Sequence, residues 1–165
     1  MRDSSKHFAL PAALCTGAAV LGALGTKVDS HWYKSLRKPT WQPPGWVFGP
    51  AWTTLYALTT IASGRVLNRL PDQASRSTFT RNLAVNMTIN VAWSWLFFSA
   101  QRPRASLLDS VALEASTLQL IKKAAEVDRT SALLLTSYAG WVGFATVLNS
   151  EIVRLNPEGA RAPRL

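Results

Sequence analysis

The sequence predicts an all-α protein, a bundle of five transmembrane helices in a single domain over residues 1–165. Three observations lead to this fold class. Five apolar blocks follow one another, and all but the fourth are near the roughly 20 residues needed to cross a hydrocarbon core of about 30 Å. Charged residues make up only 16% of the chain, below the roughly 25% usual for soluble domains. A segment rich in tryptophan and proline separates the first block from the second, as is typical of a membrane interface.

The first predicted helix covers residues 8–26. Arg2 and Lys6 precede its apolar run, which is also the pattern of a secretory signal peptide. The run is nearer the length of a membrane span than that of a signal-peptide core, and the aromatic segment follows it. We therefore interpret this block as a retained transmembrane helix.

The loop between the first helix and the second is rich in rings, and contains Trp32, Tyr33, Lys38, Pro39, Trp41, Pro43 and Pro44. Its prolines fix φ and remove backbone donors, so no regular helix is expected until the chain restarts near Trp46. Indole rings are amphipathic and concentrate where an apolar slab meets water. The loop is therefore predicted to be a stiff aromatic cover at one end of the bundle.

The remaining helices are predicted at residues 46–66, 82–100, 105–121 and 131–153, with a polar loop over 71–81. The helix at 105–121 is short and carries Asp109, Glu114 and Gln119. Ionisable groups are costly in lipid, so both carboxylates should face the bundle interior, an interface or an aqueous crevice. Because the loops after the first are short, neighbouring helices are expected to be antiparallel.

The chain has a net charge of +9, one cysteine and two histidines. The single Cys15 allows no internal disulfide, and His7 and His31 have no partner at ligand spacing, so no metal site is expected. The basic residues are best explained as helix ends that face lipid headgroups, and no nucleic-acid partner is expected. They divide equally between the two sides, so the positive-inside rule predicts no orientation. We find no recognisable catalytic constellation, so the sequence does not predict an enzyme.

Three of the predicted helices carry an aromatic face at helical spacing. These faces are formed by Phe48, Trp52, Leu55 and Tyr56, by Asn90, Trp93 and Phe97, and by Tyr138, Trp141, Ala145 and Leu148. Aromatic stripes of this kind are more often core packing than a binding site. Together, however, the three faces could line a cavity for a large flat ligand, to which Asn90 would supply a polar contact.

The loop and the second helix also carry an ordered set of residues: Trp32, Tyr33, Leu36, Lys38, Pro39, Trp41, Pro43, Pro44, Trp46, Phe48, Pro50, Trp52, Thr53, Leu55 and Tyr56. This pattern resembles the signature of the TspO/MBR family, the tryptophan-rich sensory proteins and mitochondrial translocator proteins (peripheral-type benzodiazepine receptors). The stretches NVAWSWLFF at 90–98 and YAGWVGFATVLN at 138–149 resemble the family's third and fifth helices. The resemblance covers nearly all of residues 8–156. It implies a five-helix membrane bundle that is commonly dimeric, with the loop capping a ligand cavity.

The resemblance also implies a ligand. Family members bind porphyrins and other tetrapyrroles, and many bind cholesterol or synthetic benzodiazepine-site ligands. The positions that match the family's ligand pocket are Phe48, Trp52, Asn90, Trp93, Phe97, Trp141, Ala145 and Leu148. Porphyrin or heme is the expected ligand, and no cofactor is required. The other expected partners are membrane lipid, a sterol and a second copy of the chain.

The basic residues of the loop have two interpretations. Lys34, Arg37 and Lys38 could pair with porphyrin propionates, because a cation binds a carboxylate strongly where water is partly excluded. Contact with lipid headgroups is the competing interpretation, and charge alone does not separate the two.

Two positions depart from the family pattern. Ser150 stands where the mammalian cholesterol-recognition pattern has a tyrosine, so sterol binding by that route is not expected. Ala105 stands where animal members have a pocket tryptophan. We therefore expect the ligand preference to differ from that of the mammalian proteins.

Three functions from different classes follow. The first is a membrane binding protein for tetrapyrroles that acts as a sensor, regulator or carrier. The second is a light-dependent porphyrin-degrading enzyme, in which indoles near a photosensitiser supply electrons. The third is a proton-coupled exporter of small molecules, based on Asp109 and Glu114 within a helix.

Overall fold

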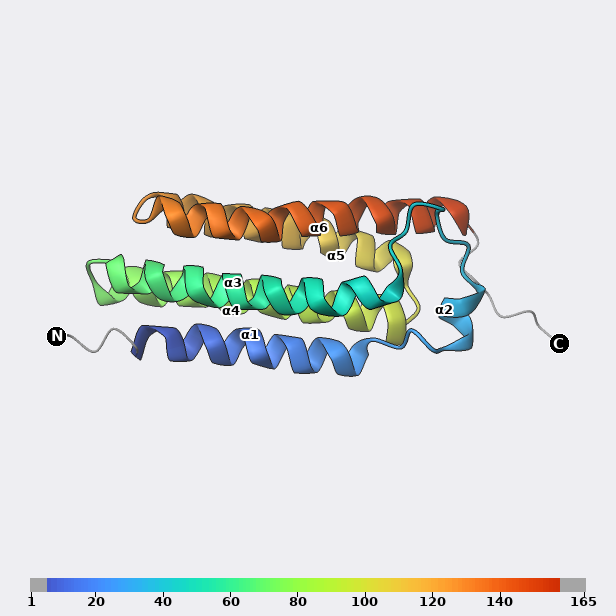
Figure 1. Ribbon diagram of the computed structural model, residues 1–165, viewed down its shortest axis with the longest axis horizontal. Helices are drawn as coiled ribbons and strands as arrows, with labels where there is room; N and C mark the ends of the chain where they lie inside the picture. Colours follow the sequence, from blue (N-terminus) through green and yellow to red (C-terminus); the bar gives the residue numbers. More distant parts are fainter. Residues whose placement is uncertain (1–5, 158–165) are drawn as a thin grey trace.

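The structure is a computed structural model that describes residues 6–157, so Arg2 of the predicted basic start lies outside it. Its elements are α1 (Lys6–Gly25), α2 (His31–Ser35), η1 (Gly45–Val47), α3 (Phe48–Arg69), α4 (Gln73–Ser94), η2 (Trp95–Ser99), α5 (Pro103–Ala125) and α6 (Arg129–Leu155). The long helices α1, α3, α4, α5 and α6 run side by side along one axis, and α2 lies at one end of the bundle (Figure 1). The prediction of an all-α fold is confirmed, and the described residues contain no strand.

Among the described helices, α1 and α6 are long and apolar enough to cross a membrane. The long helices between them in the sequence are less apolar, because they contain more polar residues. The first turns of α4 are polar, and α5 carries Asp109 and Glu114 in its middle and Lys122 and Lys123 in its last turn.

The helix α4 begins at Gln73, so the polar loop predicted at 71–81 is wrong over most of its length. Asp72 caps this helix, since its carboxylate accepts hydrogen bonds from the backbone N–H and the hydroxyl of Ser75, both at 2.8 Å. These hydrogen bonds lower the pKa of Asp72 below its ordinary value. A satisfied cap allows a polar sequence to be helical. Hydropathy had located the apolar part of the helix and not its beginning.

The helix η2 is a π-helix that ends α4. The N–H of Ala100 reaches back to the carbonyl of Trp95 at 2.8 Å, and Gln101 then turns the chain with φ of 56°. Phe97 and Phe98 are adjacent in sequence, yet only 2% and 8% of their surfaces are exposed. The wider π turn therefore changes which side chains the end of α4 directs into the protein.

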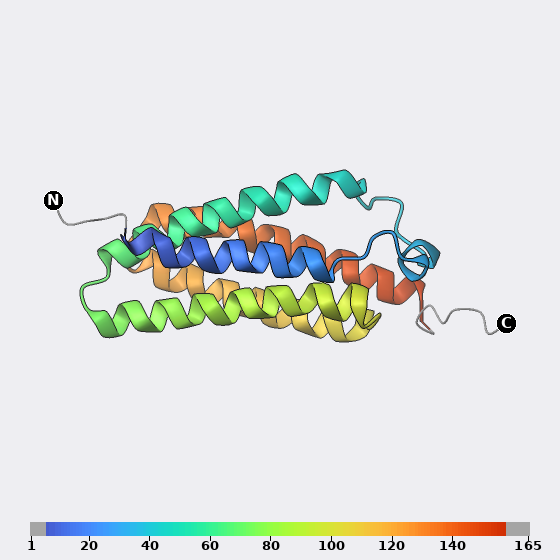
Figure 2. The same cartoon turned by 90° about the horizontal axis from the view of Figure 1, so that it is seen from below.

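Two glycines allow α1 to approach its neighbours closely. A Cβ at Gly64 of α3 would overlap the ring of Phe8, and a Cβ at Gly25 would overlap the indole of Trp95. That indole donates a hydrogen bond to the carbonyl of Leu21 at 3.0 Å, which ties α1 to η2. Toward the end of the bundle that carries α2, α3 diverges from α1 (Figure 2).

The opposite end of the bundle is held by Asp128, which precedes α6. Arg65 and Arg69 of α3 each place a guanidinium nitrogen 2.9 Å from its carboxylate, and the hydroxyl of Ser131 donates to it at 2.5 Å. Burial alone would raise the pKa of Asp128, but the hydrogen bonds from Arg65 and Ser131 and the two arginine charges outweigh burial and lower it. The carboxylate thus joins the end of α3 to the start of α6.

The loop between α1 and α3 covers the other end. It contains the short helix α2, which was not predicted and which Ser30 caps through the N–H of Tyr33. Trp32 and Leu36 are buried. The loop then crosses toward the end of α6 and returns into α3 (Figure 1).

Candidate functional site

A cavity of about 890 Å³ lies beneath this loop, between α1, α3, α4 and α6. Its size is within the roughly 300–1,000 Å³ typical of small-molecule sites. Every residue predicted to bind the ligand lines it, namely Phe48, Trp52, Asn90, Trp93, Phe97, Trp141, Ala145 and Leu148. These eight residues therefore share one cavity, whereas Leu55 and Tyr138 of the predicted faces do not line it. Contact of the eight with a ligand stays a prediction.

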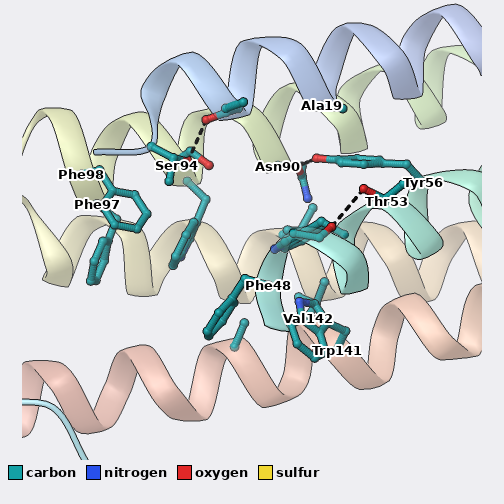
Figure 3. A pocket seen from close by; sticks show the side chains of 18 of the residues that line it. Ala19, Phe48, Thr53, Tyr56, Asn90, Ser94, Phe97, Phe98, Trp141 and Val142 are labelled. Atoms are coloured by element: carbon teal, nitrogen blue, oxygen red, sulfur yellow. Dashed lines mark hydrogen bonds between the residues drawn. The ribbon is translucent and has the colours of Figure 1, made fainter. Parts of the chain in front are cut away.

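Flat aromatic surfaces form the cavity walls (Figure 3). Trp93 stacks on Phe97, with ring centroids 5.2 Å apart and planes 11° from parallel. On the other side, Phe48 meets Trp141 edge to face at 5.8 Å. Such rings offer both faces and edges to a planar apolar ligand.

Side chains from α3, α4, α5 and α6 form a line of hydrogen bonds beside these aromatic rings. Tyr56 donates to the carbonyl oxygen of the Asn90 side chain at 2.6 Å, and Asn90 donates to the hydroxyl oxygen of Tyr138 at 3.0 Å. Tyr138 donates to Asn86 at 3.1 Å, and Asn86 donates to Thr117 at 3.0 Å. Asn90 lines the cavity, but both ends of its amide already have partners within the protein.

Tyr56 also lines the cavity and was not among the predicted ligand-binding residues. The signal was present, because Tyr56 lies eight residues after Phe48 on the same predicted face. Tyr138, which accepts a hydrogen bond from Asn90, is almost fully buried and forms no part of the cavity lining.

The loop closes the cavity through α2. Trp32 and Tyr33 both meet Phe97 edge to face, at 5.7 and 6.3 Å, and Tyr33 also lines the cavity. Gln42 lines it as well and donates to the hydroxyl of Tyr33 at 3.3 Å. Gln42 was not predicted, although it lies inside the stiff proline-rich segment.

The other predicted cover residues have varied positions. Pro39 is buried, and Trp41 meets Phe144 of α6 edge to face at 6.1 Å. Pro43 and Pro44 precede η1. Trp46 is 76% exposed, as expected of an indole at an interface.

The basic residues of the loop do not line the cavity. Lys38 donates to the backbone carbonyl of Tyr33 at 2.7 Å and lies 4.1 Å above its ring. Burial against this ring lowers the pKa of Lys38. Lys34 faces Asp29 at 3.5 Å, and both side chains are exposed. Their contact with a ligand propionate stays a prediction.

The cavity reaches the outer surface of the bundle between α1 and α3. Several of its lining residues are exposed, namely Thr16, Val20 and Ala23 of α1 and Thr53, Ala57 and Ile61 of α3. Val20 and Ile61 are 55% and 45% exposed. Most of these side chains are small, so the two helices leave a side opening where they diverge.

Two carboxylates of α5 lie near this site without being part of it. One oxygen of Asp109 and one of Glu114 are buried without a hydrogen-bond partner. Neither residue lines the cavity, although their neighbours Ser110 and Leu113 do. Within the described part of the chain, no group of three or more His, Cys, Asp or Glu side chains could hold a metal ion.

Comparison with known proteins gives the site its family context. The model of the TspO/MBR family matches residues 10–155. The tryptophan-rich protein TspO of Chlorobaculum tepidum is 35% identical over 150 residues, which cover 90% of this chain and 95% of the relative. TspO of Archaeoglobus fulgidus is 39% identical over 127 residues, 76% of this chain and 80% of the relative. The human translocator protein is 32% identical over 127 residues, 76% of this chain and 75% of the relative. Members of this family are membrane proteins. With nearly its whole length matched, this chain belongs to the TspO/MBR family.

Proposed function

We propose that this chain is a multi-pass membrane protein that binds porphyrins and related tetrapyrroles in the cavity beneath its loop. In this proposal it acts as a sensor, regulator or carrier of the ligand, and it forms a homodimer in the bilayer. The single observation that supports the proposal most is the cavity of about 890 Å³ with aromatic rings from three helices in its walls.

Five membrane spans are the arrangement that the bundle favours. From α3 onward the long helices are joined by short turns at Leu70–Asp72, at 100–102 and at 126–128, so each runs antiparallel to the next. Basic side chains lie at the helix ends, for example Arg69 in the last turn of α3 and Lys122 in the last turn of α5. In this proposal the charges lie near headgroups and the aromatic cavity lies within the apolar slab.

The shape and polarity of the cavity suit a large flat ligand. Trp93 and Phe97 present a stacked wall, and the Phe48 and Trp141 rings present an edge-to-face pair. A planar conjugated ring can stack on such surfaces and displace water from them. The side opening between α1 and α3 would admit a ligand dissolved in the bilayer.

The proposal is tested by titrating the purified protein in detergent with protoporphyrin and with heme while following tryptophan fluorescence. We expect saturable quenching, and at least tenfold weaker binding in the Trp52→Phe, Trp141→Phe double variant, because stacking on aromatic rings is a main contact. Trp46→Phe is the matched control, since Trp46 is an exposed indole that does not line the cavity. Unchanged affinity in the double variant would contradict the site. Recording porphyrin absorbance in light and in darkness separates binding from light-dependent breakdown.

Proton-coupled export is a second candidate, and one observation favours it. Asp109 and Glu114 each keep a buried carboxylate oxygen without a partner in the middle of α5, and such groups within a membrane helix are often parts of proton pathways. In vesicles, export would make uptake of a cationic dye depend on a pH gradient and on Glu114. Uptake that is the same in Glu114→Gln would exclude this candidate.

A further inference from the structure

The line of hydrogen bonds beside the cavity has a fixed direction. At its far end the hydroxyl of Thr117 donates to the backbone carbonyl of Leu113 at 2.8 Å. A carbonyl oxygen can only accept, so the proton of Thr117 is committed to it. The oxygen of Thr117 is then an acceptor, and the side-chain NH₂ of Asn86 donates to it.

The donor and acceptor of each following hydrogen bond, toward the cavity, are determined in the same way. The NH₂ group of Asn86 faces α5, where Ser116 is a second acceptor at 3.2 Å, so the Asn86 carbonyl faces α6. That carbonyl accepts the proton of Tyr138. With its proton used, the oxygen of Tyr138 accepts from the NH₂ group of Asn90.

Tyr56 is the last residue of this line. Of the residues in the line, Tyr56 is the one that has a hydroxyl group and also lines the cavity (Figure 3). The Asn90 carbonyl faces Tyr56 and accepts its proton at 2.6 Å. A phenol has a single proton to donate, and its oxygen keeps the capacity to accept. Asn86, Asn90 and Tyr138 are largely enclosed by the bundle, where each unmade hydrogen bond would be costly.

We propose that this line makes Tyr56 a hydrogen-bond acceptor toward the cavity, so that the site selects flat apolar ligands that present an N–H or O–H donor to the α3 wall. Asn90, Tyr138 and Asn86 are positioning residues that hold the proton of Tyr56 away from the ligand. The inference rests on the proposed function, because it assumes that the cavity is the ligand site.

The test uses two probes with the same ring system, 1-hydroxypyrene and 1-methoxypyrene. The first offers an O–H donor and the second offers only an ether acceptor. Dissociation constants are measured by tryptophan quenching in detergent, and the selectivity is the constant for the ether divided by that for the alcohol. Because probe size and detergent partitioning affect every variant equally, we compare this ratio with its value in Tyr56→Phe. We expect the wild-type ratio to be roughly three- to tenfold higher, the effect of one neutral hydrogen bond.

The critical variant is Asn86→Leu, which changes a residue outside the cavity lining. Without the Asn86 acceptor, the proton of Tyr138 turns to the Asn90 carbonyl and the NH₂ group of Asn90 turns to Tyr56. The proton of Tyr56 is then free to meet the ether, so the ratio falls to the Tyr56→Phe value or below. Tyr138→Phe disconnects Asn90 from Asn86 and is expected to lower the ratio in the same way.

The control is Thr59→Val, which alters a buried polar residue of α3 that lies outside both the cavity lining and the line. It should keep the wild-type ratio. A purely structural role for the line would weaken both probes together and leave every ratio unchanged. Equal ratios in wild type and Tyr56→Phe, or a wild-type ratio in both Asn86→Leu and Tyr138→Phe, would overturn the inference. If neither pyrene probe nor porphyrin binds, the proposed function itself fails.

Discussion

The side-chain amide of Asn156 makes two hydrogen bonds to the backbone of Arg37. Its oxygen accepts from the N–H of Arg37 at 3.0 Å, and its nitrogen donates to the carbonyl of the same residue at 2.9 Å. This paired contact fastens the middle of the loop to the end of α6. The loop is thereby held over the cavity by neutral hydrogen bonds and by the rings of α2, with the basic side chains left outside.

Replacing Asn156 with alanine should loosen the loop without altering the cavity. Porphyrin association and dissociation are expected to become faster by roughly three- to tenfold, because the amide hydrogen bonds that resist opening are lost, while the dissociation constant changes little. Stopped-flow tryptophan quenching measures both rates. Ser150→Ala is the control, because it removes an exposed hydroxyl that bonds only the carbonyl of Val147 within α6. Rates equal to those of wild type would show that the loop does not open by this route.

The side opening gives a second kinetic prediction. Thr53 and Thr54 are adjacent exposed residues of α3, and each hydroxyl bonds the carbonyl four residues before it. Thr53 lines the cavity and Thr54 does not. If the ligand enters between α1 and α3, Thr53→Phe slows binding and release several-fold in lipid nanodiscs, and Thr54→Phe leaves both rates unchanged. Equal behaviour of the two variants would argue against entry from the side.

Gly64→Ala should destabilise the protein, since the new Cβ would overlap the ring of Phe8. We expect a loss of about 1–3 kcal/mol in the free energy of unfolding, the usual cost of overpacking. In a Phe8→Ala background the same change should stabilise by up to about 1 kcal/mol, because alanine is the better helix former. Thermal unfolding in detergent measures the four proteins. A loss of the same size in both backgrounds would mean that the Phe8 contact is not the cause.

Asp128→Asn should remove a pH-dependent part of the stability. The pKa of Asp128 is lowered in the folded protein, so its contribution is present above the ordinary aspartate pKa of about 3.9 and is lost as the pH falls through the folded value. At neutral pH we expect the variant to be less stable by about 1–3 kcal/mol, with the difference shrinking below about pH 4. Melting curves across this range test the prediction, with Glu126→Gln, an exposed carboxylate of the same turn, as the control. A difference that is the same at all pH values would contradict it.

The sequence predicted much of the site because helical spacing determines which residues share a face, and because the resemblance to the TspO/MBR family indicated that these faces line a ligand pocket. Trp52, Trp93 and Trp141 could be assigned to inward faces before their helices were placed, and the structure brings them to one cavity. The direction of the hydrogen bonds was not predictable in this way. It depends on the meeting of Asn86 with Thr117 and of Asn90 with Tyr138, which lie on different helices.

The loop was predicted less completely for a related reason. Proline content indicated where the chain cannot be helical, but α2 depends on a local cap by Ser30. Charge indicated that Lys38 could meet an anion, whereas in the structure its ammonium group is taken up by the carbonyl and ring of Tyr33. Composition alone gives no information about such competition between an internal partner and a ligand.

The π-helix η2 determines what the deletion of one residue would do at the end of α4. A π turn holds one more residue than an α turn, and each residue of a helix rotates the chain by about 100°. Deleting one residue from Trp95–Ser99 would let α4 continue as a regular helix and would leave the later chain close to its present orientation, because the wider turn already absorbs the extra residue. The side chains within the segment would be redirected, so Phe98 would lose its contact with Tyr33, whereas α5 would start from the same side of the bundle. In an alignment of this family, a one-residue gap in this short segment would therefore mark a reshaped cavity and not a shortened loop.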